Sequence, residues 1–386
     1  MKKLGDIGKI ITGNTPKTSD HKNYETRSIC FVKPSDIAED KITRILCSEF
    51  YISEYAREKA RIVPPESVLV TCIGSIGKVA ISGIECAINQ QINAIIPDSS
   101  KCNAEYLAYL LQYKKSELQL MANAPVVPIL NKSQFSELSI ELPSLDEQKI
   151  VNQRLNKITN IISLRQQQLA KLDELVKARF VEIFGDSEYN TKHWPVVKLS
   201  DICEVGSSKR IYKNEQSSSG VPFLRISDLN ERIDGKVKNP EIFISIEKYD
   251  ELKLQGMVPI AGDVLVTSRG TLGRCYIVTE EDVFYFQDGM ISWLSKIDAR
   301  AASLYLSYLF SMRGIQKQIE TLQAGSTVAY LSITMLKKLD IMLPPLELQQ
   351  KFSSFVKCID KLKLSTKKNI EQMDTLKKTL MQQYFG

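Results

Sequence analysis

The pattern of apolar and polar residues divides the chain into four consecutive segments. Short β-rich apolar runs separated by turn signals fill residues 1–143 and return over residues 186–344. Such runs, interspersed with a few helical patches, predict mixed α/β globular domains. Residues 144–185 and 345–386 instead space their apolar side chains by three and four, which predicts a long amphipathic helix in each. The pattern therefore predicts an α+β chain in which each of two domains is followed by a long helix.

Each predicted helix carries a single apolar stripe. No proline or glycine interrupts the helices, Ser144 and Glu147 have capping-box spacing, and Pro345 suits a first helical turn. The stripes consist of Leu155, Ile158, Ile162, Leu169, Leu172, Val176 and Ile183 in the first helix, and of Phe352, Val356, Ile359, Ile370, Met373, Leu380 and Tyr384 in the second. About 40 residues give a rod of roughly 60 Å, and its stripe must be covered.

The chain contains an internal repeat that suggests what covers the stripes. KLGDI at 3–7 returns as KLSDI at 198–202, and VTCIGSIGKVAI at 70–81 returns as VTSRGTLGRCYI at 266–277. Two copies of one unit commonly associate about a pseudo-two-fold axis. The repeat therefore predicts an antiparallel helix pair that holds the two domains at opposite ends of a rigid spacer. The alternative, in which each helix folds back onto its own domain, does not suit helices of this length.

Composition narrows the class of protein. With 43% hydrophobic and 25% charged residues, the chain is typical of a soluble globular protein. No apolar run is long enough to cross a bilayer and no signal peptide is apparent, so a cytoplasmic location is expected. Eight scattered cysteines and two histidines predict reduced thiols and no metal site. The net charge of +6 is mild, so nucleic-acid contacts would rely on locally placed cations.

Two similar domains at a fixed separation suit the reading of double-stranded DNA at two half-sites. Half-sites on one face of the duplex recur about every 34–36 Å, which a helical spacer can bridge. Because the two domains differ in sequence, they can read different bases. The architecture therefore predicts a bipartite, asymmetric DNA target with a non-specific spacer.

Several motifs occur twice in the same order. These are an SDI/SDL segment, a V-T-x-x-G-[ST]-[IL]-G-[KR] turn, and an L-P-x-L-x-x-Q entry into a long helix that ends in F-G. In this arrangement the chain resembles, over essentially its whole length, the specificity subunit of type I restriction–modification systems. The resemblance implies that each domain is a target recognition domain. It also implies that the helices bind two methyltransferase subunits and help to recruit restriction subunits.

Two alternatives to this assignment stay open. One is the DNA-recognition subunit of a related, type IIG-like methyltransferase system. The other is a scaffold whose domains bind protein.

The duplicated turn supplies the first candidate DNA contacts. Its two copies share glycines, hydroxyls and a cation, which suit phosphate contacts: Thr71, Gly74, Ser75 and Lys78 correspond to Thr267, Gly270, Thr271 and Arg274. They differ at Cys72/Ser268 and Ile73/Arg269, which suits sequence readout. Arg269 can contact guanine O6 and N7, whereas Ile73 offers apolar contact to a thymine methyl. The alternative is a structural glycine hairpin in which Ile73 is a core residue and Arg269 is merely solvated.

Two further segments provide weaker candidates. Lys33, Ser35 and Asp36 align with Arg225, Ser227 and Asp228; Gln90 and Gln91 align with Gln287 and Asp288. Serine and aspartate cap turns and helices equally well, and a glutamine that can read adenine can also be a structural amide. The run Ala324–Thr327 could contact phosphate, but its counterpart Ala124-Pro125-Val126 lacks glycine and hydroxyls.

The sequence predicts no catalytic, cofactor or metal site. It lacks an amino-methyltransferase [DNS]-P-P-[YFW] motif, a glycine-rich methyl-donor turn and a P-loop. Glu147-Gln148-Lys149 has the E-x-K form of a nuclease motif, but the second copy reads Leu348-Gln349-Gln350. A non-catalytic recognition subunit is therefore expected. The rival reading, a self-contained enzyme on nucleic acid, requires cleavage or methyl transfer by the purified chain.

Overall fold

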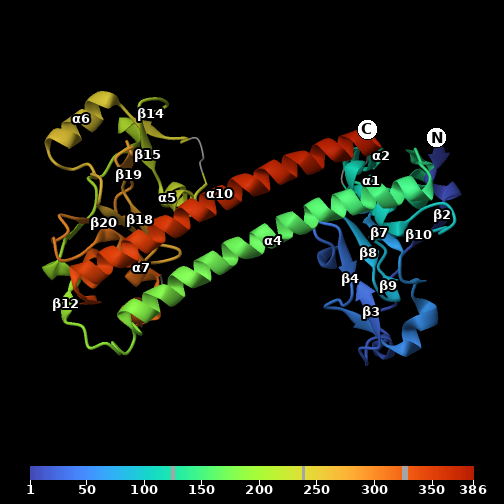
Figure 1. The fold of residues 1–386 in the computed structure, drawn as a ribbon, viewed down its shortest axis with the longest axis horizontal. Helices are drawn as coiled ribbons and strands as arrows, with labels where there is room; N and C mark the ends of the chain where they lie inside the picture. The colour runs from blue at the N-terminus through green and yellow to red at the C-terminus, as the bar shows by residue number, and fades with distance from the viewer. Residues whose placement is uncertain (123–126, 237–239, 324–328) are drawn as a thin grey trace. The chain divides into compact units, whose positions relative to one another are not determined.

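The computed structural model describes residues 1–122, 127–236, 240–323 and 329–386. The chain forms two compact units, residues 1–167 with 367–386 and residues 168–366. The division runs through the middle of both long helices, α4 (Leu145–Phe184) and α10 (Leu346–Phe385) (Figure 1). This differs from the four consecutive segments expected from the sequence, because each helix contributes one half to each unit.

The first unit is built on two sheets. The central sheet has the order β2-β10-β7-β8-β4, with β2 (Gly8–Thr12), β4 (Thr43–Ile45), β7 (Val68–Thr71), β8 (Val79–Ser82) and β10 (Ile92–Pro97). The second has the order β5-β3-β9-β6, with β3 (Ile29–Val32), β5 (Tyr51–Ile52), β6 (Ile62–Val63) and β9 (Cys86–Ile88). Strand β1 (Lys2–Lys3) pairs with β11 (Ser139–Ile140). In these sheets β3/β9 and β4/β8 pair in parallel, and the other neighbours are antiparallel.

Strand β7 is buried throughout, and its apolar residues Val68, Leu69 and Val70 cover both of its faces. Val68 and Val70 belong to the core that also contains Leu107 and Leu111 of helix α1 (Ala104–Tyr113), whereas Leu69 packs with Val32 of the second sheet. Helices α2 (Lys115–Met121) and α3 (Lys132–Glu137) follow α1, and short 3-10 helices are η1 (Leu4–Asp6), η2 (His21–Asn23), η3 (Pro34–Asp36) and η4 (Glu54–Lys59).

The second unit repeats this plan. Its sheets have the orders β13-β20-β17-β18, β14-β16-β15-β19 and β12-β21. The strands are β12 (Val196–Lys198), β13 (Glu204–Gly206), β14 (Gln216–Ser217), β15 (Val221–Leu224), β16 (Phe243–Ile244), β17 (Val264–Thr267), β18 (Cys275–Ile277), β19 (Tyr285–Phe286), β20 (Ile291–Ser295) and β21 (Asp340–Met342). Helices α7 (Ser303–Ser311), α8 (Arg313–Leu322) and α9 (Ile333–Lys337) match α1 to α3. Helices α5 (Ile226–Ile233) and α6 (Ile246–Leu254) occupy the positions of η3 and η4 in the first unit. The 3-10 helix η5 (Leu199–Asp201) matches η1, and η6 (Lys213–Glu215) precedes β14.

The antiparallel helix pair predicted from the sequence is confirmed within each unit. In the first unit, Leu155 of α4 and Met381 of α10 share one core, and the Arg154 guanidinium donates to the Tyr384 hydroxyl at 2.7 Å. In the second, the ring centroids of Phe180 and Phe352 lie 5.4 Å apart. The alternative in which each helix folds back onto its own domain is wrong, because both helices are continuous over 40 residues.

Half of the predicted stripe positions are buried, and the other half are only partly covered. Leu155, Ile158, Ile162, Val176, Phe352, Val356 and Ile359 are buried, whereas Leu169, Leu172, Ile183, Ile370, Met373, Leu380 and Tyr384 are half-buried. Phe180 and Phe184, which the predicted stripe omitted, have no exposed surface. They pack against Tyr305 of the second domain, a contact that a helical period alone does not indicate.

The L-P-x-L-x-x-Q motif joins each helix to its domain through a buried glutamine. The Gln148 amide donates to the carbonyls of Lys101 (3.1 Å) and Pro143 (2.9 Å) and accepts the Asn103 N–H (2.8 Å). Gln349 makes the same three contacts, with Arg300, Pro344 and Ala302. Both glutamines are fully buried. A buried amide that satisfies three backbone groups fixes where each helix starts.

Two further findings concern cysteines and membranes. All eight cysteines are unpaired. Within the described ranges, no helix has the length and apolar character that crossing a membrane requires.

Candidate nucleic-acid interface

The duplicated turn is a β-hairpin that is braced from inside by a threonine. The Thr71 hydroxyl accepts the Lys78 N–H at 3.0 Å and donates to the Ser75 carbonyl. Thr267 does the same with Arg274 (3.0 Å) and Thr271 (2.6 Å). Both threonines are fully buried. Their hydroxyls are thus used within the turn, which favours a structural role over the predicted phosphate contact.

The glycines allow the hairpin to turn and leave its tip open. Gly74 and Gly270 have φ values of +74° and +70°, which β-carbon-bearing residues rarely adopt. A Cβ at either position would meet no atom within 4 Å. The next residues, Ser75 and Thr271, are exposed. The glycine hairpin expected as the structural alternative is therefore present, and its tip faces solvent.

The two positions that differ between the copies have different exposures. Cys72 and Ser268 are buried, and the Ser268 hydroxyl hydrogen-bonds Ser292 at 2.7 Å. A buried side chain cannot reach a base, so these two predicted readout residues belong to the base of the turn. Ile73 is half-buried and packs against the core, whereas Arg269 is exposed.

The shared cation of the turn is ion-paired inside each domain. Lys78 lies 3.1 Å from Glu39, which also pairs with Lys115 at 2.7 Å. In the second domain, Arg274 pairs with Asp234 and donates to the Asn230 amide oxygen at 2.7 Å. Hydrogen bonds from Lys115 and Lys78 lower the pKa of Glu39, and a hydrogen bond from Arg274 lowers that of Asp234.

This ion pair bears on the predicted role of the cation. With side-chain exposures of 18% for Lys78 and 28% for Arg274, both cations are largely neutralised within the domain. They tie the turn to the segment that follows η3 and α5. These ion pairs hold Lys78 and Arg274 against their own domains, and phosphate contact by either side chain stays a prediction.

The aspartates of the SDI/SDL segments are caps, as the structural alternative proposed. Asp36 accepts the Lys33 N–H at 2.8 Å, and Asp228 accepts the Arg225 N–H at 2.9 Å. Arg225 also pairs with Glu241 at 2.8 Å. The serines Ser35 and Ser227 are exposed, and the Lys33 ammonium lies 3.3 Å from the Phe50 ring centroid. The serines and Lys33 are the members of this segment that remain accessible.

In the segment of Gln90 and Gln91 and in its counterpart, some side chains already have partners within their own domain. Gln90 is exposed and accepts a hydrogen bond from the Thr15 hydroxyl, whereas Gln91 is held by Asn89 at 3.2 Å. In the second copy, Asp288 pairs with Arg210 at 3.0 Å, and Gln287 is half-buried.

The structure brings the three predicted segments together at one face of each domain. In the first domain, the Asn89 N–H donates to the Val32 carbonyl (3.1 Å) and the Cys72 N–H to the Gln91 carbonyl (2.7 Å). Equivalent bonds join Gln287 to Leu224 and Ser268 to Met290, each at 2.9 Å. We call this surface the loop face; it comprises residues 33–36, 72–78 and 89–91 in the first domain and 225–228, 268–274 and 287–290 in the second.

Sequence reasoning missed two segments that border the loop face. One is the stretch after strand β2, where the Asn14 N–H donates to the Ile88 carbonyl at 3.0 Å; its counterpart contains Lys209, whose N–H donates to the Tyr285 hydroxyl at 2.7 Å.

The other missed segment crosses the hairpin tip. The Leu130 N–H donates to the Cys72 carbonyl at 2.9 Å, and the Leu331 N–H to the Ser268 carbonyl at 3.0 Å. The candidate phosphate run Ala324–Thr327 and its counterpart Ala124-Pro125-Val126 lie outside the described residues.

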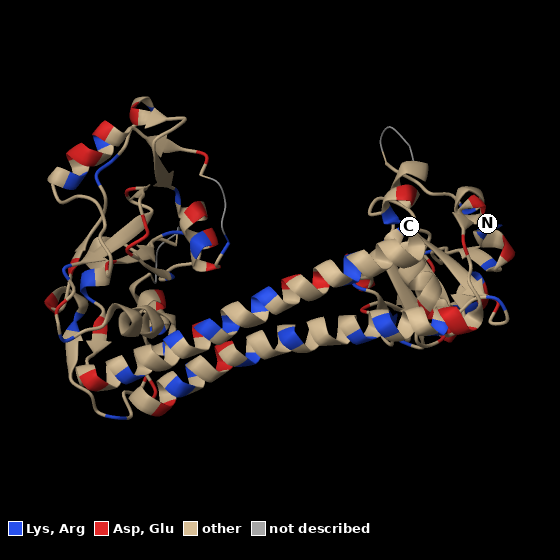
Figure 2. Ribbon diagram, turned by 45° about the horizontal axis from the view of Figure 1, so that its top comes forward, with Lys and Arg blue, Asp and Glu red and all other residues tan. Residues whose placement is uncertain are grey.

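Charges of both signs are interspersed over the domains and along the helices (Figure 2). This agrees with the mild net charge of +6. An interface with DNA must therefore depend on single exposed cations such as Arg269 and Lys209 rather than on a broad positive field.

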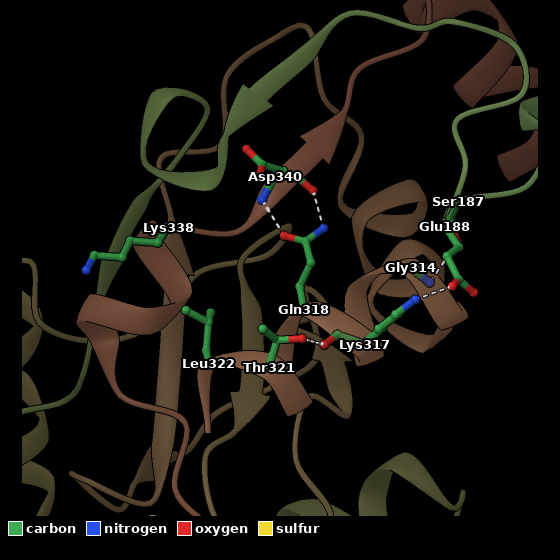
Figure 3. Close-up of a pocket in the computed structure, with 9 residues that line it drawn as sticks. All are labelled: Ser187, Glu188, Gly314, Lys317, Gln318, Thr321, Leu322, Lys338 and Asp340. Atoms are coloured by element: carbon green, nitrogen blue, oxygen red, sulfur yellow. Dashed lines mark hydrogen bonds and ion pairs between the residues drawn. The ribbon is translucent and has the colours of Figure 1, made fainter. Parts of the chain in front are cut away.

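A cavity of about 410 Å³ in the second unit lies away from the loop-face residues (Figure 3). Several of its polar side chains are paired with one another or with backbone: Glu188 with Lys317 at 2.6 Å, and the Gln318 amide with the Asp340 backbone at 3.1 and 2.8 Å. These pairs join α8 to the segment after α4 and to β21. Over the described part of the chain, no group of three or more His, Cys, Asp or Glu side chains is arranged to hold a metal ion.

Comparison with known proteins identifies similar chains along nearly the full length. The specificity subunit of the type I restriction enzyme MjaIX from Methanocaldococcus jannaschii is 26% identical over 99% of this chain and 91% of that protein. The MjaVIII specificity subunit of the same organism is 26% identical over 79% of this chain and 73% of that protein.

Solved structures show the same fold. A chain from a structure of a type I restriction–modification system has a TM-score of 0.63, with 16% identity over 99% of this chain and 96% of that chain. The S subunit from M. genitalium has a TM-score of 0.55, with 13% identity over 98% and 94%. The family described as type I restriction modification DNA specificity domain matches residues 1–174 and again residues 191–373. The chain therefore belongs to this family and carries its specificity domain twice.

Proposed function

We propose that this chain is the DNA-specificity subunit of a type I restriction–modification system and that it recognises a bipartite, asymmetric target. In this role it performs no catalysis and directs methyltransferase and restriction subunits to the DNA. Each domain reads one half-site through its loop face. The family membership and the names of the relatives support this function.

One observation carries the proposal: the same backbone presents different side chains in the two domains. The hydrogen bonds that assemble the loop face are repeated, as are the positive-φ glycines and the ion pair behind the turn. Next to the exposed tip, however, the half-buried Ile73 of the first domain is replaced by the exposed Arg269 of the second. A shared frame suits a common pose on the phosphate backbone, and a changed tip suits different bases.

Exposed tip residues are the proposed contacts. Gly74, Ser75, Gly270 and Thr271 supply close backbone approach and hydroxyls to phosphate, and Arg269 reads guanine. Gln90, Ser35, Ser227 and Lys33 flank the tip and complete the proposed surface. The candidate residues that are buried or ion-paired support this surface from within the domain. Asp36 and Asp228 cap the adjacent segment, and the turn is shaped by Thr71, Thr267, Cys72, Ser268, Lys78 and Arg274.

The long helices are the proposed docking sites for two methyltransferase subunits and, through them, for restriction subunits. Their exposed sides carry large apolar residues, including Leu164 (63% exposed), Leu364 (71%) and Leu376 (43%). The proposal places the methyltransferase subunits over these leucines, where their apolar surface would be removed from water. The helices are also proposed to set the spacing of the half-sites, since each of them enters both compact units.

The test uses the chain assembled with its methyltransferase subunits in a host. Mapping the methylated positions in host DNA should give one bipartite motif with unequal halves and a constant gap. Arg269→Ala should relax base preference in one half only. A uniform, unipartite or absent motif would contradict the proposed function.

Two controls distinguish the rival readings. Binding of the assembled complex should weaken steeply with salt if phosphates anchor it, whereas a protein-binding scaffold predicts DNA affinity that is indifferent to salt and to Arg269→Ala. Cleavage or methyl transfer by the purified chain, supplied with Mg²⁺ or a methyl donor, would instead indicate a self-contained enzyme.

A further inference from the structure

A second segment lies against the tip of each turn and pairs with it residue by residue. Ile73 forms an isolated antiparallel bridge with Ile129, and Arg269 forms the equivalent bridge with Tyr330. Hydrogen bonds on the adjacent residues, Leu130 to Cys72 and Leu331 to Ser268, hold the strands in register. The backbone thus places one residue of each segment side by side at the same point of both loop faces.

The side chains of these pairs alternate between core and solvent. Leu130 and Leu331 are fully buried, whereas Ile129 is 47% exposed and Tyr330 is half-buried. This alternation is that of a strand with one face on the core. The outward residues 129 and 330 are therefore not needed to fill the core, and they lie beside the residues proposed to read bases.

The two pairs have different chemistry. In the first domain both members are isoleucines, which make an apolar surface. In the second, the Arg269 guanidinium lies 5.2 Å from the centroid of the Tyr330 ring, within the range of a cation–π contact. Among the residues that the structure describes, Arg269 forms no ion pair, unlike Arg225 and Arg274. Its charge is oriented by the ring without being neutralised.

We propose that residues 129 and 330 are specificity-determining positions that act through residues 73 and 269. Tyr330 is a positioning residue that holds the Arg269 guanidinium flat for a bidentate contact with guanine. Ile129 and Ile73 together form an apolar contact for a thymine methyl. This inference rests on the proposed function. It adds that each half-site is contacted by a pair of side chains, 73 with 129 or 269 with 330, rather than by a single side chain.

The energetic argument is that an arginine held by a ring loses less conformational freedom on binding. A solvent-exposed cation–π contact is worth enough to change base discrimination by roughly two- to five-fold. Loss of the arginine itself removes the whole bidentate contact and should change discrimination by roughly ten-fold or more. The two effects are therefore separable by size.

The experiment measures base preference in a randomised target library with the assembled methyltransferase complex. Tyr330→Ile, which places in the second domain the residue that the first domain already tolerates, should weaken the guanine preference at one position of one half-site by roughly two- to five-fold. Tyr330→Phe should retain the preference, because the ring remains. Arg269→Ala combined with Tyr330→Ile should be no worse than Arg269→Ala alone. The other half-site is the internal control.

A transfer experiment tests the pair directly. Ile73→Arg with Ile129→Tyr should create a guanine preference in the first half-site that exceeds the effect of either single substitution. If the double variant and Ile73→Arg alone had the same guanine preference, the proposal that residues 73 and 129 act as a pair would be overturned. A Tyr330→Ile variant with the wild-type guanine preference would overturn it equally.

Failure of the inference and failure of the proposed function give different results. If Arg269→Ala alters one half-site but every substitution at Tyr330 leaves preference unchanged, residue 330 is not a positioning residue and the proposed function stands. If the unmodified complex shows no bipartite preference, the proposed function itself fails.

Discussion

At the scale of single residues, the polar side chains form two groups. One group satisfies buried backbone groups, and the other faces solvent, where a partner can bind. Thr71, Asp36 and Gln148 are polar and repeated in both copies, yet each has its hydrogen-bonding capacity used inside its own domain. Ser75 and Arg269 are polar and left outside. Polarity in the sequence cannot separate these two groups, because the partners of the first group are distant in the chain or are backbone atoms.

Replacing the buried glutamine at the start of the first helix should destabilise its unit. Gln148→Leu leaves the Lys101 and Pro143 carbonyls and the Asn103 N–H without partners. Loss of such buried bonds should lower the free energy of unfolding by about 2–4 kcal/mol. Denaturant unfolding measures this, with Gln153→Leu at an exposed site of the same helix as the matched control. Equal stability of the two variants would show that the glutamine is dispensable.

The ion pair behind the first turn should make its stabilisation depend on pH. Hydrogen bonds from Lys115 and Lys78 lower the pKa of Glu39 below its ordinary value of 4.5. A carboxyl with a lowered folded pKa contributes stability above the unfolded pKa and loses it as pH falls through the folded pKa. Wild type should therefore exceed Glu39→Gln in stability near pH 7, and the gap should narrow as the pH falls below 4.5 and through the lowered pKa of the folded state. A gap that is unchanged in acid would contradict this account.

At the scale of elements, the sequence predicts the long helices and the repeat. It does not predict which segments pack together inside each domain. The three-and-four spacing from Leu155 to Ile183 marks a helix without any knowledge of its surroundings. In contrast, the placement of Cys72 depends on backbone hydrogen bonds with Gln91 and Leu130, and the ion pair of Lys78 depends on Glu39. The pairing of Arg269 with Tyr330 joins segments about 60 residues apart in sequence, which no local period indicates.

Gly74 at the hairpin tip should be required because of its positive φ angle, and not because a larger side chain would clash with its neighbours. Gly74→Val places a branched side chain at φ +74°, although a Cβ there meets open space. We expect a loss of about 1–2 kcal/mol in the free energy of unfolding and a disordered tip. Gly74→Asn, which tolerates this conformation better, should cost less. Thermal unfolding of the two variants measures the difference; equal losses would mean that side-chain volume decides.

At the scale of the whole molecule, each long helix has two distinct environments. The first half of α4 and the last residues of α10 complete one unit, and the remaining halves complete the other. The domain surfaces that receive them are aromatic, with Tyr106 near Phe385 and Tyr305 near Phe184. The pseudo-two-fold plan predicted from the repeat thus has a concrete counterpart: each F-G helix end packs in the unit opposite to the one in which its helix begins.

Lengthening both helices should lengthen the DNA target. Insertion of four residues near the middle of α4 and of α10 adds about 6 Å to each helix. If the helices set the spacing, the gap of the methylated motif should grow by about two base pairs. Mapped methylation of host DNA measures the gap, and equal-length substitutions at the same sites are the control. The same gap after insertion would rule out the helices as the determinant of spacing.

The contribution of residues 367–386 to the first unit has a consequence for synthesis on the ribosome. Phe385 packs its ring 5.3 Å from that of Tyr106, and the Tyr113 hydroxyl donates to Gln382 at 2.6 Å. Gln382 and Phe385 are translated more than 260 residues after the helix α1 that they contact. The domain that emerges first must therefore keep an apolar patch uncovered until the end of α10 has been translated. Vectorial folding, in which each domain closes as it leaves the ribosome, is thus not available to the N-terminal domain of this protein.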